Sequence, residues 1–489
     1  MTVIQPLSAL TPLLESNAML LSIIRKSCPG ICGSHATLEQ FASHVLRDGS
    51  PPELAVFILC ICKTLPSDDI ERHLALIDQY IISDDEYLGS LEGLECALLQ
   101  SMTYTDIGQL RRGWLTNRRG LVFAQLMGLH RTHSLSPQRE SIWWSLFQID
   151  RFVSMLLGLP YGIADAHCDM RLNGKALSSN FSPATFLVEC ASIAGKIIDR
   201  IQGVCEQSYS STLDTDQHLD NLAREAPTSW WNVPSLPAPD DPVSALEWQE
   251  AILAQMCFHQ NRAYLHMPFM LQSTTNPRYE YSRTACLGGA REMLRLYHLL
   301  RDRDTPLYDC KAFDFIAFTA AILLALDLLG YGHRTAASKS QQDVNDWALI
   351  DKTMELLWRA SLKKGGNVAA QSYQTLEFNF HVRDRDYLET DVDPKKVVIP
   401  YFGTISLRRA SRLHDQNSAS TSSGVTPGVT QGIVTPADIN GKCCRHQVDT
   451  VITTRSSLTM ASICQTPLTT SSSRASFHGR TTPSPTVGL

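Results

Sequence analysis

Residues 136–157 read SPQRESIWWSLFQIDRFVSMLL, and this pattern predicts one long helix. The Ser136-Pro137 pair is a typical helix start, because the hydroxyl caps free backbone N–H groups and proline is tolerated at the first helical position. Apolar residues then recur three or four positions apart, as on one face of a helix: Ile142, Leu146, Ile149, Val153 and Leu156. The Gly158-Leu159-Pro160 turn ends the helix, because glycine allows unusual backbone angles and proline cannot continue the hydrogen-bond ladder.

Similar helical periodicity extends from about Leu38 to Ala370, with few strand-like alternations. A second clear helix start is Asp241-Pro242, which follows a proline-rich loop at 234–242 and precedes an apolar face. That face consists of Leu246, Leu253 and Phe258. Long helices with short polar connections and little strand signal predict an all-α fold, a large multi-helix domain.

The composition changes after Leu407, where the chain becomes dense in Ser and Thr and Phe477 is the only aromatic residue. Such a segment buries too little apolar surface to offset the entropy lost on ordering. We therefore predict three regions: an N-terminal segment at 1–37, a helical domain at 38–407 and a disordered Ser/Thr/Pro-rich tail at 408–489. Four pairs in the tail are potential sites for proline-directed kinases: Thr426-Pro427, Thr435-Pro436, Thr482-Pro483 and Ser484-Pro485.

The overall composition argues against several classes of protein. The 489 residues carry a formal net charge of -6, which is unlike a globally basic nucleic-acid binder, so DNA contact would require a local patch or a partner. The segment 1–20 lacks the basic start and sustained apolar run of a secretory signal. The most apolar stretch, 315–326, is shorter than the roughly 20 residues needed to span a bilayer, and we expect it to form a buried helix.

A specific series of motifs lies between Trp114 and Asp169. In chain order they are RRGLVFAQLMGLHR at 118–131, IWWSLFQIDR at 142–151 and GLPYGI at 158–163, followed by Asp165. This order resembles the middle homology region of fungal zinc-cluster transcription factors: Gly-Leu-His-Arg, Trp-Trp, Asp-Arg, then Gly-x-Pro with a downstream Asp. One departure is that the family often has a run of arginines before Trp-Trp, where this chain has RESI at 139–142.

Later segments match the family in the expected order and extend the resemblance over roughly residues 50–407. They are 259–261 with the Leu-His-x-Pro helix end at 265–269, then 282–297, 315–321 and 397–407. The resemblance implies a nuclear regulatory region that controls RNA polymerase II transcription in a fungus, as many relatives do for secondary-metabolite or nutrient-use genes. The implied partners are DNA, contacted indirectly or through an N-terminal zinc cluster, the transcription machinery or a related factor, and a small-molecule effector, but no membrane.

The residues of the central motif favour an architectural role. Trp143 and Trp144 lie about 100° apart around a helix, so they can face different neighbours, and each can bury on the order of 200 Å². We expect Asp150-Arg151 to pair internally or with His130-Arg131. These contacts hold a fold together, and we predict no catalytic residue among them.

The cysteines lack the spacing of the family's DNA reader, a six-cysteine cluster that holds two zinc ions. The nearest pairs are Cys28-x-x-x-Cys32 and Cys60-x-Cys62, which do not fill a tetrahedral zinc shell. Cys443-Cys444-x-His446 lies in the tail, and His130 and His133 suit a helix end. We predict no metal or cofactor site. Either the natural protein lacks the zinc cluster or its first exon is missing from the gene prediction.

An enzyme is the remote alternative, because helical prenyl-diphosphate enzymes hold magnesium with acidic clusters. The candidates are Asp68-Asp69 and Asp84-Asp85-Glu86. Both clusters follow a serine and suit helix starts, and neither has a third acid one turn later. No Gly-x-Ser-x-Gly, phosphate loop or nicotinamide fingerprint is present. A further alternative is a co-regulator or ligand-sensing helical scaffold that acts off DNA.

Overall fold

The computed structural model describes most of the first 380 residues and three strands beyond them. The described residues are 25, 28–33, 37–64, 70–131, 136–170, 181–203, 208–233, 242–273, 276–301, 310–328, 340–363, 365–380, 395–399, 403–407 and 450–453. Within these ranges the packed cores consist of helices, so the predicted all-α architecture is confirmed. None of the described helices combines the length and the apolar character needed to cross a membrane.

The helices follow one another along the chain. Those of the N-terminal half are α3 (Pro29–Cys32), α4 (Leu38–Asp48), α5 (Pro51–Thr64), α6 (Ile70–Ile77), the π-helix η1 (Asp78–Ile82), α7 (Asp85–Leu88), α8 (Leu91–Asp106), α9 (Leu110–Leu126) and α10 (Pro137–Leu157). Those that follow are η2 (Asp165–His167), α11 (Pro183–Gln202), α12 (Tyr209–Glu225), α13 (Thr228–Trp231), α14 (Pro242–Met270), η3 (Pro277–Tyr279), α15 (Glu280–Arg301), α16 (Ala312–Leu326), α17 (Gln341–Ser361) and α18 (Asn367–Phe380).

Helix α10 has the start and the end that its sequence predicts. The Ser136 hydroxyl accepts a hydrogen bond from the Arg139 backbone N–H at 3.5 Å, and Pro137 is the first helical residue. Gly158 ends the helix in the left-handed conformation, with φ at 69°. Of the predicted stripe, Ile149 is half-buried and the other four residues are buried. The periodicity therefore identified the buried face correctly.

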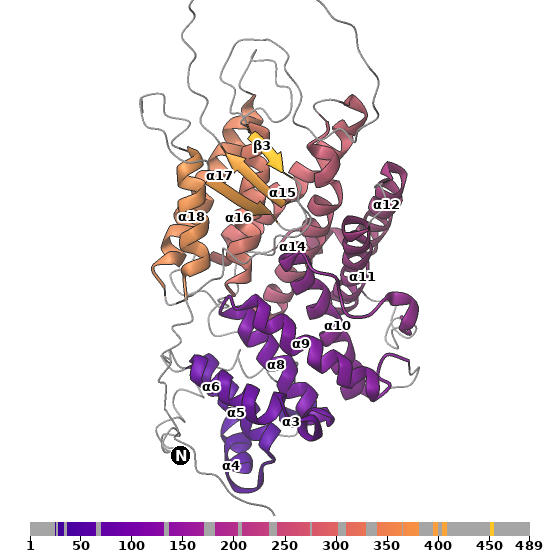
Figure 1. The fold of residues 1–489 in the computed structure, drawn as a ribbon, viewed down its shortest axis with the longest axis vertical. Helices are drawn as coiled ribbons and strands as arrows, with labels where there is room; N and C mark the ends of the chain where they lie inside the picture. Colours follow the sequence, from indigo (N-terminus) through magenta and orange to yellow (C-terminus); the bar gives the residue numbers. More distant parts are fainter. Residues whose placement is uncertain are drawn as a thin grey trace, which may run out of the picture.

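Two hydrophobic clusters form the core, and α10 belongs to both. Its first half packs with α3–α9, through residues such as Trp143 and Leu146. Its second half packs with α11 and the later helices, through residues such as Val153 and Leu156. Figure 1 shows α3–α9 gathered in one half of the molecule and α14–α18 in the other. Helix α10 thus helps to tie the two halves together.

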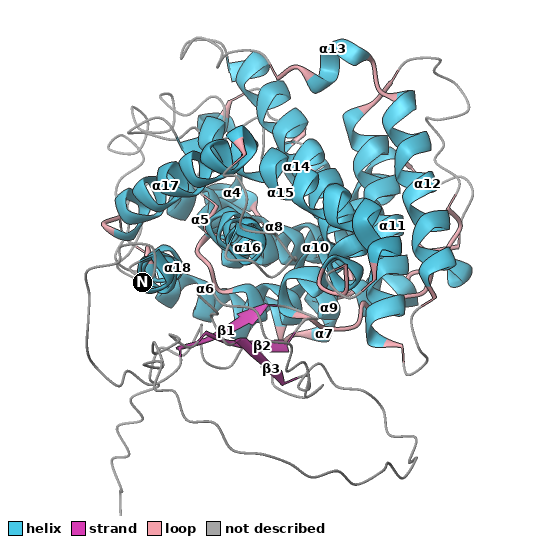
Figure 2. Ribbon diagram, turned by 90° about the horizontal axis from the view of Figure 1, so that it is seen from above, coloured by secondary structure: helices cyan, strands magenta, loops and turns pink. Residues whose placement is uncertain are grey.

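Helix α16 is the centre of the C-terminal half. All 15 of its residues are buried, which confirms the buried helix predicted for 315–326. Helices α15, α17 and α18 pack around it, as the view from above shows (Figure 2). Since neighbours cover it on all sides, it needs no polar face.

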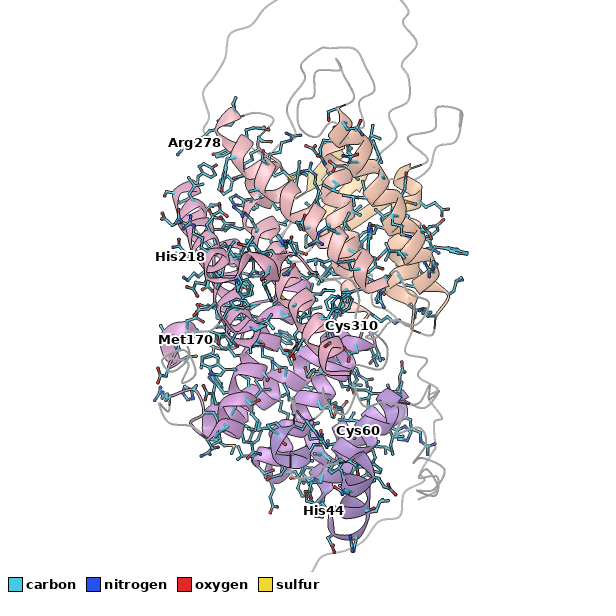
Figure 3. The ribbon with its side chains drawn as sticks, turned by 180° about the vertical axis from the view of Figure 1, so that it is seen from behind. His44, Cys60, Met170, His218, Arg278 and Cys310 are labelled. Atoms are coloured by element: carbon cyan, nitrogen blue, oxygen red, sulfur yellow. The ribbon has the colours of Figure 1, made fainter. Side chains whose placement is uncertain are left out.

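A second junction joins the halves beside Cys310, which lies between them in Figure 3, whereas Cys60 lies within the N-terminal half. The backbone N–H of Lys311 donates to the carbonyl of Asp106 at the end of α8, at 2.9 Å. The Asp106 carboxylate also pairs with Lys63 of α5. The end of α8 is therefore fixed from both sides.

The strands form a small antiparallel sheet in the order β1-β2-β3. Strand β1 (Lys395–Ile399) pairs with β2 (Gly403–Leu407), with Lys395 opposite Leu407. Strand β2 then pairs with β3 (Thr450–Thr453), with Leu407 opposite Thr450. The sequence analysis placed 397–407 in the helical domain, and apart from β3 the predicted tail at 408–489 lies outside the described residues.

Candidate functional site

The Trp-Trp motif lies in the interior. Trp143 and Trp144 are both buried, and both pack on Phe147, with ring centroids 6.3 and 5.4 Å away. The Trp143 ring also lies 6.0 Å from His130, which follows the end of α9. The two tryptophans therefore belong to one aromatic cluster, as expected of residues that hold a fold together.

Arg151 is fully buried and held by contacts on several sides. Its guanidinium lies 3.5 Å from the centre of the Phe147 ring and 4.5 Å from that of Tyr161. It donates to the Ile163 carbonyl at 2.9 Å and to the Asp165 carboxylate at 2.5 Å. Arg151 thus ties the turn after α10 back onto the helix.

The neighbouring Asp150 faces a different helix. It accepts a hydrogen bond from the Gly162 backbone N–H at 2.6 Å and forms an ion pair with Arg118 of α9, at 2.8 Å. Burial raises the pKa of Asp150 above its ordinary value, and Arg118 only partly opposes this effect. Of the two pairings expected for Asp150-Arg151, the internal one is found and the one with His130-Arg131 is not: Asp150 pairs with Arg118 and Arg151 with Asp165. Successive helix positions diverge by about 100°, which separates the two partners.

The turn from 158 to 165 gathers these contacts because Gly158 reverses the chain in the left-handed region. The Leu159 N–H donates to the Ser154 carbonyl at 3.0 Å and closes the turn. Asp165 then accepts a hydrogen bond from Ser192 of α11 at 2.7 Å. The motif therefore joins α9, α10 and α11 through buried polar contacts.

The Leu-His-x-Pro segment also ends a helix, as the resemblance implies, since α14 ends at Met270 just after Pro268. Its His266 is fully buried. The Nε2 atom lies 3.2 Å from a carboxylate oxygen of Asp216 on α12, and Nδ1 lies 3.0 Å from the Ser282 hydroxyl on α15. His266 therefore links three helices.

Asp216 is the centre of this second polar cluster. Tyr281 donates to its carboxylate, and Arg262 lies 3.3 Å away. Burial alone would raise the pKa of Asp216, but hydrogen bonds from His266 and Tyr281 bring it below its ordinary value. The carboxylate is thus ionised at neutral pH and lies among Tyr281, His266 and Arg262.

Ser282, His266 and Asp216 have the residue types of a hydrolase triad, but their arrangement is unsuited to catalysis. A nucleophilic serine must meet its substrate, whereas Ser282 is 0% exposed. Its hydroxyl already contacts both His266 and Tyr209. The geometry therefore supports a structural role for the three residues.

The acidic clusters considered for magnesium also have structural uses. The Asp84 carboxylate caps α7 by accepting from the backbone N–H groups of Glu86 and Tyr87. Asp85 pairs with Arg119 at 2.6 Å. The other cluster, Asp68-Asp69, lies outside the described residues. The helix-start interpretation of Asp84 is thus confirmed.

The cysteines whose spacing is nearest to that of a zinc-binding motif are buried in the core. Cys28, Cys32, Cys60 and Cys62 are all buried, and burial raises the pKa of each thiol. A raised pKa disfavours the thiolate that binds metal. In the part of the chain that the structure describes, no group of three His, Cys, Asp or Glu side chains is placed to hold a metal ion. His133 and the Cys443-Cys444-x-His446 segment lie outside it.

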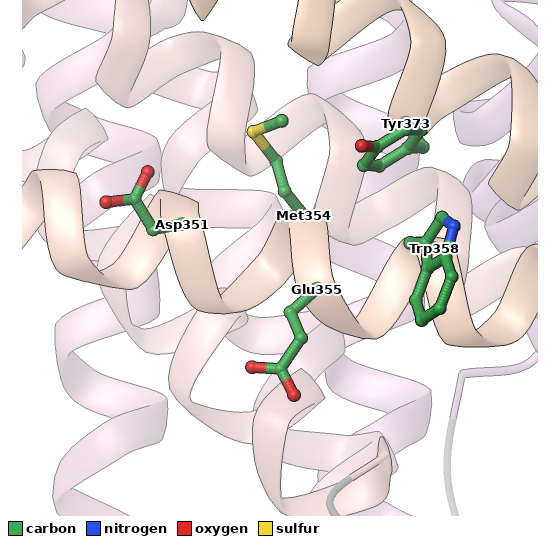
Figure 4. A pocket seen from close by; sticks show the side chains of 5 residues that line it. All are labelled: Asp351, Met354, Glu355, Trp358 and Tyr373. Carbon is green, nitrogen blue, oxygen red and sulfur yellow. The ribbon is translucent and has the colours of Figure 1, made fainter.

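A surface hollow of about 310 Å³ lies between α17 and α18. It is lined by Asp351, Met354, Glu355, Trp358 and Tyr373, and Figure 4 shows Tyr373 and Trp358 at one end and Asp351 at the other. Its volume is at the lower limit of small-molecule sites. Glu355 is engaged by Lys352 at 3.4 Å and Arg359 at 3.9 Å, so the hollow has no set of converging unengaged charges.

Comparison with known proteins finds relatives that are named as regulators. The chain is 28% identical to a dehydrocurvularin biosynthesis regulator of Alternaria cinerariae, over 74% of the chain and 51% of that protein. It is 27% identical to transcription factor sdnS of Sordaria araneosa, over 72% of the chain and 49% of that protein. The chain is related to fungal transcription regulators.

A more distant relative agrees with the zinc-cluster resemblance. It is the Zn(2)-C6 fungal-type transcription factor mpsB of Macrophomina phaseolina, 27% identical over 52% of the chain and 38% of that protein. The chain spans about half the length of the curated relatives that it matches first. No family model and no solved structure matches it.

Several residues of the chain's polar core were not identified from the sequence. Arg118 and Asp165 were recognised as motif members, but their partners were not. Nothing in the sequence marked Ser192 and Gly195 of α11 as members of this core. The structure places Gly195 against Arg151, because a Cβ atom at Gly195 would lie 3.2 Å from Arg151 Nε. These contacts join segments that are far apart in sequence, so helical periodicity cannot reveal them.

Proposed function

We propose that this chain supplies the helical regulatory region of a nuclear, pathway-specific transcription regulator in a fungus. One observation carries the proposal: the residues of the family motif are buried in structural contacts, in a chain whose relatives are named as transcription factors and biosynthesis regulators. A regulatory domain needs such a scaffold, whereas an enzyme needs an accessible reactive group. The chain acts by binding and not by catalysis.

The regulatory region corresponds to residues 38–407, with the N-terminal segment 1–37 before it and the tail 408–489 after it. Cys28, Ile31 and Cys32 also pack in the N-terminal core, so part of the first segment belongs structurally with the domain. The net charge of -6 favours DNA contact through a zinc-cluster module or a partner protein. The helical region would then hold or release the transcription machinery in response to an effector.

Deleting the gene in its own fungus and measuring all transcripts tests this proposal. We expect the transcripts of one pathway to change together and to recover when the wild-type chain is restored. Ser282→Ala should restore them too, because Ser282 has no catalytic role here. A stable Ser282→Ala protein that fails to restore them would favour the enzyme interpretation, and unchanged transcripts in the deletion strain would contradict regulation.

A further inference from the structure

The outer face of α17 carries a heptad pattern that no described element covers. Its exposed positions are spaced alternately by three and four residues, as in a coiled-coil seam: Gln341, Val344, Ala348, Asp351, Glu355, Trp358 and Leu362. The large apolar members, Val344, Trp358 and Leu362, are between 48% and 69% exposed. The seam is therefore apolar towards both ends and acidic in the middle.

The outer face of α9 has the opposite charge. Leu115, Val122 and Leu126 are between 52% and 76% exposed and lie on one side of the helix. Arginines accompany them along that side: Arg111 and Arg112 are exposed, and Arg119 is half-buried. Exposed apolar residues in such a row are typical of protein contact surfaces.

The two faces are complementary when the helices run antiparallel. Aligning Val344 with Leu126 places Ala348 beside Val122, Asp351 beside Arg119 and Trp358 beside Arg112. Apolar residues then meet apolar residues at the first two positions, an acid meets an arginine, and an arginine meets an indole ring, which favours cations. Leu115 falls beside Glu355, so this position adds no apolar contact. Antiparallel helix dipoles also attract each other.

The arginines of α9 already have contacts within the chain: Arg119 donates to the Ser83 carbonyl at 3.0 Å, and Arg112 donates to Gln109 at 3.1 Å and lies over the Tyr104 ring. Arg119 pairs with Asp85, which is largely solvent-exposed, and such surface pairs contribute little stability. Glu355 would keep its own contacts with Lys352 and Arg359. No buried polar group has to be uncovered before the faces meet.

We propose that α9 of one copy docks antiparallel on α17 of a second copy of this chain. The two helices lie well apart within one molecule in both views, so they cannot satisfy each other internally (Figures 1 and 2). Because the two faces that meet, on α9 and α17, are different, the contact either occurs twice in a closed pair or continues as an open row of copies. This inference does not depend on the proposed function.

Two variants of the full chain test the contact by analytical ultracentrifugation. One carries Val122→Glu with Leu126→Glu on α9, and the other carries Val344→Glu with Trp358→Glu on α17. We expect the wild type to self-associate and each variant to weaken that association at least about tenfold. Mixing the two variants should restore a pair, because one keeps an intact α9 and the other an intact α17.

The matched control changes exposed apolar residues elsewhere, Leu46→Glu on α4 with Leu213→Glu on α12. This control should associate like the wild type, and circular dichroism should show native helicity in all variants. The proposal is overturned if the wild type remains monomeric at about 100 µM, if the control loses association equally, or if mixing fails to restore a pair. The first result would point to a different protein as the occupant of α17.

Discussion

At the level of single residues, the family motif consists of buried side chains whose partners come from other elements. Arg151 is enclosed by two aromatic rings and an acid, and Asp150 by an arginine and a backbone N–H. Removing one member of such a pair is costly, because the other is left buried without its partner. The motif therefore preserves a set of contacts and not a reactive group.

The tryptophans should dominate stability. Trp143→Ala and Trp144→Ala each leave a cavity in the N-terminal core and should lower the free energy of unfolding by roughly 3–5 kcal/mol. Tyr80→Ala is the matched control, because Tyr80 is an aromatic residue that is 61% exposed and its loss should cost much less. Chemical denaturation followed by circular dichroism measures all three. Unchanged stability in both core variants would refute their structural role.

Asp216 should make stability dependent on acid pH. Its pKa is lower in the folded chain than its ordinary value, so the unfolded chain binds the proton more tightly. The stabilisation is therefore complete above about pH 4 and is lost as pH falls through the folded pKa. Asp216→Asn should lower stability at neutral pH, and the difference from wild type should shrink on acidification. A difference that does not change with pH would contradict this account.

At the level of elements, local signals in the sequence predicted local features well. Helix α10 starts at Ser136 and ends at Gly158 as expected, since both residues act on neighbouring backbone groups. The partners of Asp150 and Arg151 were not predictable, because Arg118 and Asp165 reach them only after the chain has folded. The strands at 395–399 and 403–407 were also missed, since short strands form through pairing and carry weak local signals.

The C-terminal end of α10 provides a test at this level. Gly158→Ala forces a side chain into the left-handed region and should cost about 1–2 kcal/mol. Gly158→Asn should cost less, because asparagine adopts this conformation more readily. Thermal unfolding of both variants measures the difference. Equal losses would mean that contacts, and not backbone conformation, limit this position.

At the level of the whole molecule, α10 and the junction between Asp106 and Lys311 couple the two halves. Leu146 lies in the N-terminal cluster and Leu156 in the C-terminal cluster, on the same helix. A substitution that destabilises either cluster should therefore destabilise the other as well. The domain should behave as one cooperative unit despite its two cores.

Leu146→Ala and Leu156→Ala test this coupling. Each should destabilise by about 2–5 kcal/mol and shift one shared unfolding transition. Tryptophan fluorescence and circular dichroism should report the same midpoint in both variants. Two separate transitions, with each variant shifting only its own, would show that the halves are independent.

On the proposed function, this helical chain regulates transcription at the promoters of its pathway. The most direct measurement is the chromatin occupancy of the tagged, full-length protein in its own fungus, by crosslinking and sequencing. We predict discrete peaks at the promoters of the pathway genes whose transcripts respond to the deletion. A stable, expressed protein with no enrichment on chromatin would contradict the claim and favour a regulator that acts off DNA.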